Sequence, residues 1–332
     1  MAVSILAVET SCDDTSAAII KDGKVCSNVI YGQEIHKKYG GVIPEAASRL
    51  HIQYILPVIK EALIHGHCDL KDLDAVAYTQ SPGLIGSLLV GCHTVKGIAQ
   101  VLNIPSIAVQ HLHAHVLSNL IDKPKPKFPF LCLTVSGGHT QIVICKSPAD
   151  LEIIGSTIDD AAGEAFDKTA KMLNLEYPGG PLIDRNARSG NGKRFSFAKP
   201  KVDGLNFSFS GLKTSVLYFL QKQEDNFIET NLTDLCASIQ ETIVDILLSK
   251  LKKAVEQTGI KEVCLAGGVS ANSQLRQDFI LLAEKNKWNH YIPKFEYCTD
   301  NAGMIGMSAW FKYQVQDFAD LSTTPSARVE LN

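Results

Sequence analysis

Apolar and polar positions along the chain alternate between short strand-like runs and longer helical patterns. Residues 4–20 form an apolar run, a small polar turn and a second apolar run, and residues 130–145 repeat this arrangement. The prolines of segment 122–129 favour an extended connector between the two. We interpret the pattern as two related halves, each opening with a hairpin. The alternative is that such pieces recur by chance in an α/β protein.

Helical and strand-like patterns alternate after each hairpin. This order is typical of an α/β protein with mixed sheets. The expected helices are 44–62, 83–102, 232–255 and a final helix 301–318; the expected strands are 75–78, 107–109 and 262–266; and 319–332 is expected to be an exposed tail.

Composition narrows the class of protein. The chain has 332 residues, of which 45% are hydrophobic, and a formal net charge of −3. This length indicates about two domains, and the apolar content excludes general disorder. The near-neutral charge excludes an obvious DNA-coating protein, although a local nucleic-acid site is compatible with it.

The chain has no recognisable targeting or membrane pattern. No uninterrupted apolar stretch reaches the roughly 18 residues of a membrane helix, and the apolar start lacks the basic flank of a signal peptide. Nine cysteines without a C-x-x-C pair suit reduced thiols and exclude a zinc ribbon. We therefore expect a cytoplasmic protein without a membrane contact.

Three loops of small residues are candidates for ligand binding. The turn 136–140 contains two glycines between two strands, and backbone N–H groups in such a turn converge on an anion. Its counterpart 11–15 carries Asp13 and Asp14, which suit metal handling, proton transfer or hydroxyl binding. The loop 266–272 follows a strand and opens a helix. Together they predict a nucleotide held between two lobes, although each alone is also an ordinary structural turn.

His111 and His115 are spaced four residues apart in a helical pattern, so both side chains can bind one divalent metal. Leu112 occupies the position of the glutamate in the metallopeptidase pattern His-Glu-x-x-His, so such a peptidase would lack its base. Asp300 is one candidate for a third ligand, which spacing alone does not select. The alternative is a pair of ordinary helix histidines.

Two further segments suit substrate binding. Carboxylates and close backbone contact at a glycine can hold a ribose, and Asp167, Gly180 and Asp184 offer both around a rigid turn at 177–181. The stretch 185–202 contains six basic residues and no acidic one, with Phe195 and Phe197 between them. That combination fits RNA binding by phosphate contact and base stacking. A solvated basic loop is the alternative.

Motifs along nearly the whole chain resemble the bacterial type of the TsaD-like family, the universal tRNA threonylcarbamoyladenosine transferases. The matching segments, in family order and spacing, are 9–15, 40–49, 81–84, 111–115, 135–140, 159–180, 207–213, 266–272 and 299–301. The resemblance implies a two-lobed actin-like and Hsp70-like (ASKHA) fold with duplicated mixed-sheet domains and a central cleft. We place one lobe at 1–121 plus 301–332 and the second at 122–300.

The resemblance also implies an activity: transfer of a threonylcarbamoyl group from threonylcarbamoyl-AMP to the N6 amine of the adenosine 3′ of the anticodon, with release of AMP. The tRNAs concerned read codons that start with A. By position, His111, His115 and Asp300 would bind one divalent metal, Fe²⁺ with Zn²⁺ as a substitute, and Asp13 would be the catalytic carboxylate. The residues implied to bind the adenylate are Thr134, Val135, Ser136, Gly137, Gly138, Asp167, Gly180, Asp184 and Asn272.

Partners follow from the same resemblance: tRNA, a smaller paralogous (TsaB-like) subunit and a small (TsaE-like) ATPase. Segment 54–63 has an apolar helix face for a protein contact, although it can equally belong to the core. A kinase-like phosphotransferase and a non-catalytic scaffold are the competing interpretations. The histidine pair argues against both, because such kinases hold magnesium through carboxylates and phosphates and a scaffold would have lost the metal ligands.

Overall fold

The computed structural model describes residues 2–328, which form two compact units. The first unit comprises residues 1–125 and 293–332, and the second comprises 126–292. The chain therefore leaves the first unit after residue 125 and returns to it at residue 293, before the last helix. These boundaries differ from the expected ones near 121 and 300, so Asp300 lies in the first unit.

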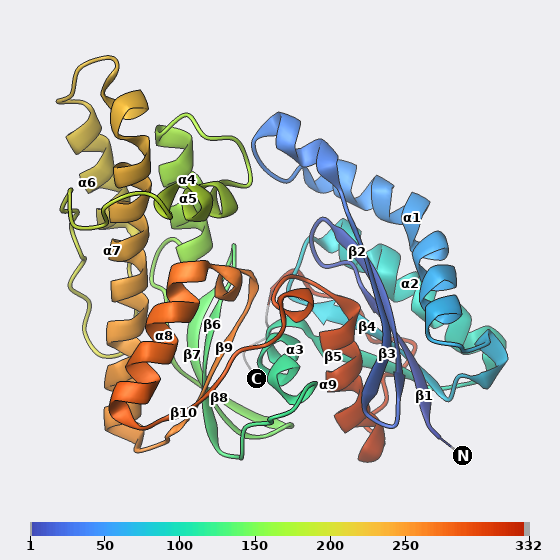
Figure 1. The fold of residues 1–332 in the computed structure, drawn as a ribbon. Coiled ribbons are helices and arrows are strands. Elements are labelled where there is room, and N and C mark those ends of the chain that lie inside the picture. Colours follow the sequence, from blue (N-terminus) through green and yellow to red (C-terminus); the bar gives the residue numbers. More distant parts are fainter. Residues whose placement is uncertain (1, 329–332) are drawn as a thin grey trace. The chain divides into compact units, whose positions relative to one another are not determined.

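Each unit is built on a five-stranded mixed sheet (Figure 1). The strand order is β3-β2-β1-β4-β5 in the first unit and β10-β9-β6-β7-β8 in the second. The first strand of each unit lies in the middle, with an antiparallel hairpin on one side and parallel strands on the other. This shared topology confirms the two related halves, each opening with a hairpin.

The bounds of the elements are as follows. The first unit contains β1 (Ser4–Glu9), β2 (Asp14–Lys21), β3 (Lys24–Gly32), α1 (Pro44–His65), β4 (Ala75–Ser81), α2 (Ile85–Leu102), β5 (Ser106–Gln110), α3 (His111–Leu117) and α9 (Ala302–Gln314). The second contains β6 (Phe130–Val135), β7 (Thr140–Ser147), β8 (Asp150–Ser156), α4 (Ala162–Met172), α5 (Gly179–Ala187), α6 (Ser210–Leu220), α7 (Phe227–Thr258), β9 (Glu262–Ala266), α8 (Ser273–Asn286) and β10 (Asn289–Tyr291).

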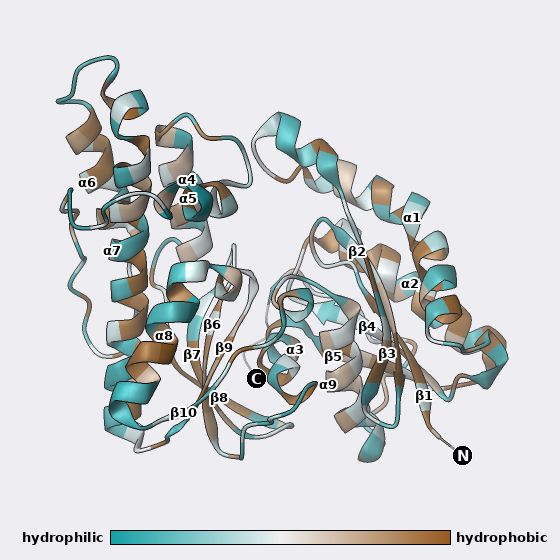
Figure 2. Ribbon diagram, in the orientation of Figure 1, coloured by the Kyte–Doolittle hydropathy of each residue, from teal (hydrophilic) through white to brown (hydrophobic). Residues whose placement is uncertain are grey.

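The first sheet is covered on both faces, which explains the continuous apolar run at the start of the chain. Side chains alternate across a strand, so Leu6 and Val8 of β1 pack with α1 and α2, whereas Ile5 and Ala7 pack with α9. Along α1, hydrophobic and hydrophilic residues alternate as bands in Figure 2. The polar residues at the carboxyl ends of β1, β4 and β5 therefore differ from the apolar residues that make up most of these strands.

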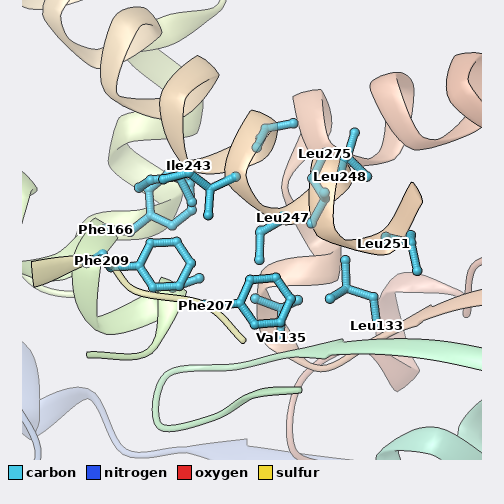
Figure 3. Packing of buried hydrophobic residues seen from close by; sticks show 14 of the residues in the cluster. Leu133, Val135, Phe166, Phe207, Phe209, Ile243, Leu247, Leu248, Leu251 and Leu275 are labelled. Atoms are coloured by element: carbon cyan, nitrogen blue, oxygen red, sulfur yellow. The ribbon is translucent and has the colours of Figure 1, made fainter. Parts of the chain in front are cut away.

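The second unit has its largest core between its sheet and helices α4, α7 and α8. Figure 3 shows Leu133 and Val135 of β6 in one cluster with Phe207, Phe209 and Leu247. The Phe207 and Phe209 rings stack with centroids 6.4 Å apart. This core fixes the strand ends and helix starts at which the predicted adenylate residues lie.

Within the described residues, α2 is the one helix long and apolar enough to cross a membrane by length and composition. Its Leu88, Cys92 and Val95 are fully buried in the first unit, so it has the character of a core helix.

The segment after α9 is largely exposed, as expected, but it is hydrogen-bonded to the first unit. The predicted final helix 301–318 ends at Gln314, and Ala319 then donates a backbone hydrogen bond to Ser106 on β5. The buried ammonium of Lys96 donates to the carbonyl oxygens of Leu321 and Thr323. Residues 319–327 are thus attached along the first unit, and we call them the strap. The last part of the predicted tail, 329–332, lies outside the described residues.

We predict that the strap and Lys96 stabilise each other. Lys96→Met in the full chain should lower the stability of the first unit by about 1.5–3 kcal/mol, the range for hydrogen bonds to a charged group. In a chain truncated after Asp317, the same substitution should be neutral or stabilising, because the truncation leaves a buried ammonium without acceptors. Calorimetric unfolding of the four proteins measures this cycle, with Lys252→Met as the exposed control. Equal effects in both backgrounds would contradict it.

Candidate active site

Polar side chains lie together at the carboxyl ends of β1, β4 and β5 in the first unit. His111 and His115 lie on α3, which starts directly after β5, and Gln110 caps this helix by accepting a hydrogen bond from the His113 backbone N–H at 2.6 Å. The side-chain amide oxygen of Asn301 caps α9, which fixes the loop that carries Asp300. Chain segments far apart in sequence therefore meet at this point.

His111, His115 and Asp300 form a cluster, which we call the triad. Nε2 of His111 and Nε2 of His115 lie 3.3 and 3.1 Å from Oδ1 of Asp300. Tetrahedral ligands at about 2.0–2.1 Å from a metal lie about 3.3 Å from one another. The two distances to Asp300 agree with this spacing, and the group could therefore hold a metal ion. The structure also places Asp300, which sequence spacing left open, beside the two histidines.

Glu9 supports the triad from behind. Its fully buried carboxylate lies 3.0 Å from Nδ1 of His111 and accepts a hydrogen bond from the Thr79 hydroxyl at 2.6 Å and another from the Ser11 backbone N–H. A carboxylate on the far nitrogen of a histidine orients the ring and raises its basicity as a ligand. Sequence reasoning missed Glu9, although a carboxylate ending an otherwise apolar buried strand was a usable signal.

Electrostatics prepare the triad for a cation. Burial by itself disfavours a charged imidazole, yet the Asp300 and Glu9 carboxylates hold the pKa of His111 well above its ordinary value. Burial lowers the pKa of His115, so this ring stays neutral. Burial tends to raise the pKa of Asp300, but His111 and His115 hold it below its usual range. The cluster thus attracts positive charge, and a metal would replace the proton on His111.

Asp13 lies in the turn between β1 and β2, and Asp14 is the first residue of β2. We call residues 11–15, which include both, the acidic turn. Both side chains are partly buried. Burial, together with repulsion from Asp300, Asp13 and Glu9, raises the pKa of Asp14 to about 8. Asp14 is therefore close enough to Asp300 and Glu9 for their charges to disfavour its own.

The predicted adenylate residues all belong to the second unit. The turn 136–139 is closed by a 2.8 Å hydrogen bond from Ser136 N–H to the His139 carbonyl, and a Cβ at Gly137 or Gly138 would meet open space. The side chains of Thr134 and Val135 are buried in the sheet, so only their backbone is available. Gly267 has a φ of +84°, and a Cβ there would lie 2.4 Å from the Val135 carbonyl oxygen. The 266–272 loop therefore runs against the end of β6.

The remaining adenylate residues form a second connected group. Asp167 accepts hydrogen bonds from the backbone N–H groups of Gly179 and Gly180, at 2.8 and 3.3 Å. Gly180 lies in the first turn of α5, so the expected rigid turn at 177–181 is partly helix. Asp184 accepts from the backbone and hydroxyl of Ser273, at 3.0 and 2.6 Å. Asn272 caps α8.

The basic stretch 185–202 does not offer free aromatic rings for base stacking. Phe195 and Phe197 pack against Phe219, with ring centroids 5.3 and 5.6 Å apart. Arg188, Arg194 and Lys199 are paired with Asp184, Asp234 and Asp245. Because the two rings pack inside the unit, they do not support the stacking part of the RNA hypothesis. Among the described residues of this stretch, the cations without an ion pair are Arg185, Lys193 and Lys201.

Comparison with known proteins gives one consistent family. The model of the family "TsaD: tRNA N6-adenosine threonylcarbamoyltransferase" matches residues 24–307. A protein of that name from Christiangramia forsetii is 55% identical over 98% of this chain and 98% of its own length. Another, from Riemerella anatipestifer, is 54% identical over 99% of this chain and 98% of its own length.

Solved structures of low sequence identity share the fold. Full-length HypF superposes with a TM-score of 0.63 at 14% identity, covering 98% of this chain and 47% of HypF. Component A of the Acidaminococcus fermentans (R)-2-hydroxyglutaryl-CoA dehydratase superposes with a TM-score of 0.55 at 16% identity, covering 94% of this chain and 99% of that one. The expected ASKHA fold with duplicated mixed-sheet domains is thereby confirmed.

We predict that Glu9 sets the metal affinity of the triad. Glu9→Gln keeps the size but removes the charge next to His111, so Zn²⁺ should bind about 10–100-fold more weakly. Isothermal titration of metal-free protein with Zn²⁺ measures the change, and the exposed Glu45→Gln is the control. An unchanged affinity in Glu9→Gln would show that Glu9 has no supporting role.

Proposed function

Because the chain belongs to the TsaD family of tRNA N6-adenosine threonylcarbamoyltransferases, we propose that it takes the threonylcarbamoyl group from threonylcarbamoyl-AMP. The acceptor is the N6 amine of the adenosine 3′ of the anticodon, in tRNAs that read codons starting with A. Membership of the family makes the chain a tRNA-modifying transferase. The observation that carries the finer proposal is the buried triad next to the acidic turn.

In this proposal, one divalent metal binds to the triad, as Fe²⁺ or in its place Zn²⁺. Imidazole nitrogens suit both metals, and a single carboxylate completes three protein ligands while leaving positions open for substrate. When bound, the metal supplies Lewis acidity toward the carbamoyl carbonyl oxygen. Glu9 holds His111 in the ligating orientation through the contact to Nδ1.

The carboxylate of Asp13 takes the proton in the transfer step. The N6 amine attacks the carbamoyl carbon, and the bond from that carbon to the phosphate oxygen breaks. AMP leaves with the bonding electron pair, and Asp13 accepts the proton that the amine nitrogen loses. Asp14 keeps a proton more easily than a solvated aspartate because burial and three neighbouring carboxylates disfavour its charge.

The second unit binds the adenylate part of the donor. Gly137 and Gly138, at the end of the segment 134–138, offer backbone N–H groups in an open turn, and the N-terminus of α4 approaches this turn because Gly163 has no side chain. Asp167 and Asp184 supply acceptors for ribose hydroxyls, with Gly180 and Asn272 beside them. Each acceptor is held by hydrogen bonds inside the unit, so the binding groups are preorganised.

Two protein partners complete the proposal: a smaller TsaB-like paralogue and a small TsaE-like ATPase. The outer face of α1 supports a protein contact, because Ile52 and Leu56 lie one turn apart and are 64% and 63% exposed. Ile85 and Leu89 of α2, a helix that packs against α1, are also 48% and 38% exposed. We assign the smaller paralogue to this face. The reaction takes place in the cytoplasm, where the nine free thiols stay reduced.

We expect the chain, with both partners and threonylcarbamoyl-AMP, to modify unmodified tRNA and release AMP. Asp13→Asn should lower kcat roughly 10²–10⁴-fold, the usual size of a general-base contribution. Mass spectrometry of digested tRNA measures the product, and Asp69→Asn at an exposed site is the control. Removal of metal with a chelator should abolish transfer, and added Fe²⁺ or Zn²⁺ should restore it. A full rate for Asp13→Asn with normal metal and donor binding would refute its role.

We also expect the double substitution Ile52→Asp and Leu56→Asp to prevent the complex with the smaller paralogue. Two carboxylates on an apolar contact add a desolvation cost without a partner charge. Size-exclusion chromatography with light scattering measures the complex, and Leu281→Asp, at an exposed leucine of the second unit, is the control. Complex formation by the double variant at the wild-type concentration would place the paralogue elsewhere.

A further inference from the structure

His51 is a fully buried histidine that neither the triad nor the adenylate residues include. It lies on α1 and makes two hydrogen bonds with the acidic turn. Nδ1 lies 2.8 Å from the hydroxyl of Thr15, and Nε2 lies 2.9 Å from the carbonyl oxygen of Cys12. The two contacts enclose Asp13 and Asp14, one on each side in the sequence.

The partners of His51 define its tautomer. A carbonyl oxygen can only accept, so Nε2 carries the hydrogen that binds Cys12. Burial lowers the pKa of His51 and keeps the ring neutral, so Nδ1 is an acceptor and the Thr15 hydroxyl donates to it. One neutral ring therefore satisfies an acceptor at the start of the acidic turn and a donor at its end. A rotation of the ring would break both bonds together.

The other contacts of this segment hold its start. The Ser11 carbonyl accepts from the Leu84 N–H at 2.7 Å, and the Ser11 N–H donates to Glu9. From Asp14 onward the chain pairs with β3, where Asp14 lies opposite Gly32. Between these anchors, His51 is the side chain that ties residue 12 to residue 15. The path of the backbone through Asp13 thus depends on a residue of α1.

We propose that His51 is a positioning residue for the transfer reaction, which from α1 holds the acidic turn in the conformation that presents the Asp13 carboxylate to the attacking amine. The inference rests on the proposed role of Asp13. His51 touches no metal ligand or adenylate residue in the described structure. Ser11, whose hydroxyl lies 3.2 Å from Nδ1 of His111, is held by Glu9 and Leu84 without His51. We therefore expect the loss of His51 to act on the chemical step and to leave metal and donor binding unchanged.

The size of the effect follows from geometry. A displacement of a reacting group by about 1 Å can cost roughly 10²-fold in rate. Ile52 follows His51 directly and belongs to the proposed docking face for the smaller paralogue, so the measurements use the complete complex. His36 is a matched control: it is also buried, with Nε2 2.9 Å from the Gln33 side chain and Nδ1 accepting from the Ile43 N–H, and it makes no hydrogen bond with the acidic turn.

The experiment compares kcat, KM for threonylcarbamoyl-AMP, bound metal and thermal midpoint for five variants. His51→Leu removes both hydrogen bonds, and we expect kcat to fall roughly 10²-fold with KM and metal content unchanged. His51→Gln keeps an N–H donor near the position of Nε2, and we expect it to recover part of kcat. His36→Leu should lower the thermal midpoint about as much as His51→Leu does, but its kcat should stay at the wild-type value. Asp13→Asn combined with His51→Leu should be no slower than Asp13→Asn alone, because residues that act as one unit are not additive.

Three results would overturn the inference. They are a kcat of His51→Leu close to wild type, an equal fall of kcat in His36→Leu, and a fall that follows lost metal or a raised KM. Failure of the proposed function gives a different result, because Asp13→Asn alone would then retain full activity. If Asp13→Asn is inactive and His51→Leu is active, only the inference about His51 is refuted.

Discussion

The buried chain of charge from Glu9 through His111 to Asp300 is the constraint on which the first unit depends. A fully buried carboxylate is costly unless it is paired and hydrogen-bonded. Glu9 meets that condition through His111, Thr79 and Ser11, which lie on three different segments. The ends of β1, β4 and β5 must therefore be assembled together, and Asp300 brings in the loop before α9. The same arrangement that makes the carboxylates tolerable also makes the site attractive to a cation.

The two units use one topology for different chemistry. In each unit, the central strand and the strand that follows it form a hairpin, and the turn of this hairpin lies at the carboxyl end of the central strand. In the first unit this turn carries Asp13 and Asp14, and in the second it carries Gly137 and Gly138. Carboxylates repel a phosphate and suit proton transfer, whereas glycines leave backbone N–H groups open to an anion. Duplication of a fold thus supplies two equivalent positions, and the side chains of the turn decide their function.

Local patterns predicted helices and strands correctly where a single hydrophobic periodicity extends over the whole segment. The helical spacing of 44–62 and 83–102 appears as α1 and α2, and the apolar strand 262–266 appears unchanged as β9. Patterns failed where tertiary packing supplied the partner. Phe195 and Phe197 looked available for stacking because basic residues surround them, but Phe219 on α6 covers both. The strap is largely exposed, as expected, but its attachment to Lys96 was not predicted, because the acceptors are backbone carbonyls, which every residue type carries.

The amino-acid sequence alone determined the duplicated α/β organisation and the family, and it identified the histidine pair, the acidic turn and the glycine loops, because each is a local pattern. The tertiary structure decided which residues from distant parts of the chain join these motifs. It selected Asp300 from the other carboxylates and added Glu9 behind His111, across a separation of 102 residues. It also showed that His51 holds the acidic turn. Hydrogen bonds between distant segments depend on how sheets and helices pack, and neither spacing nor composition contains that information.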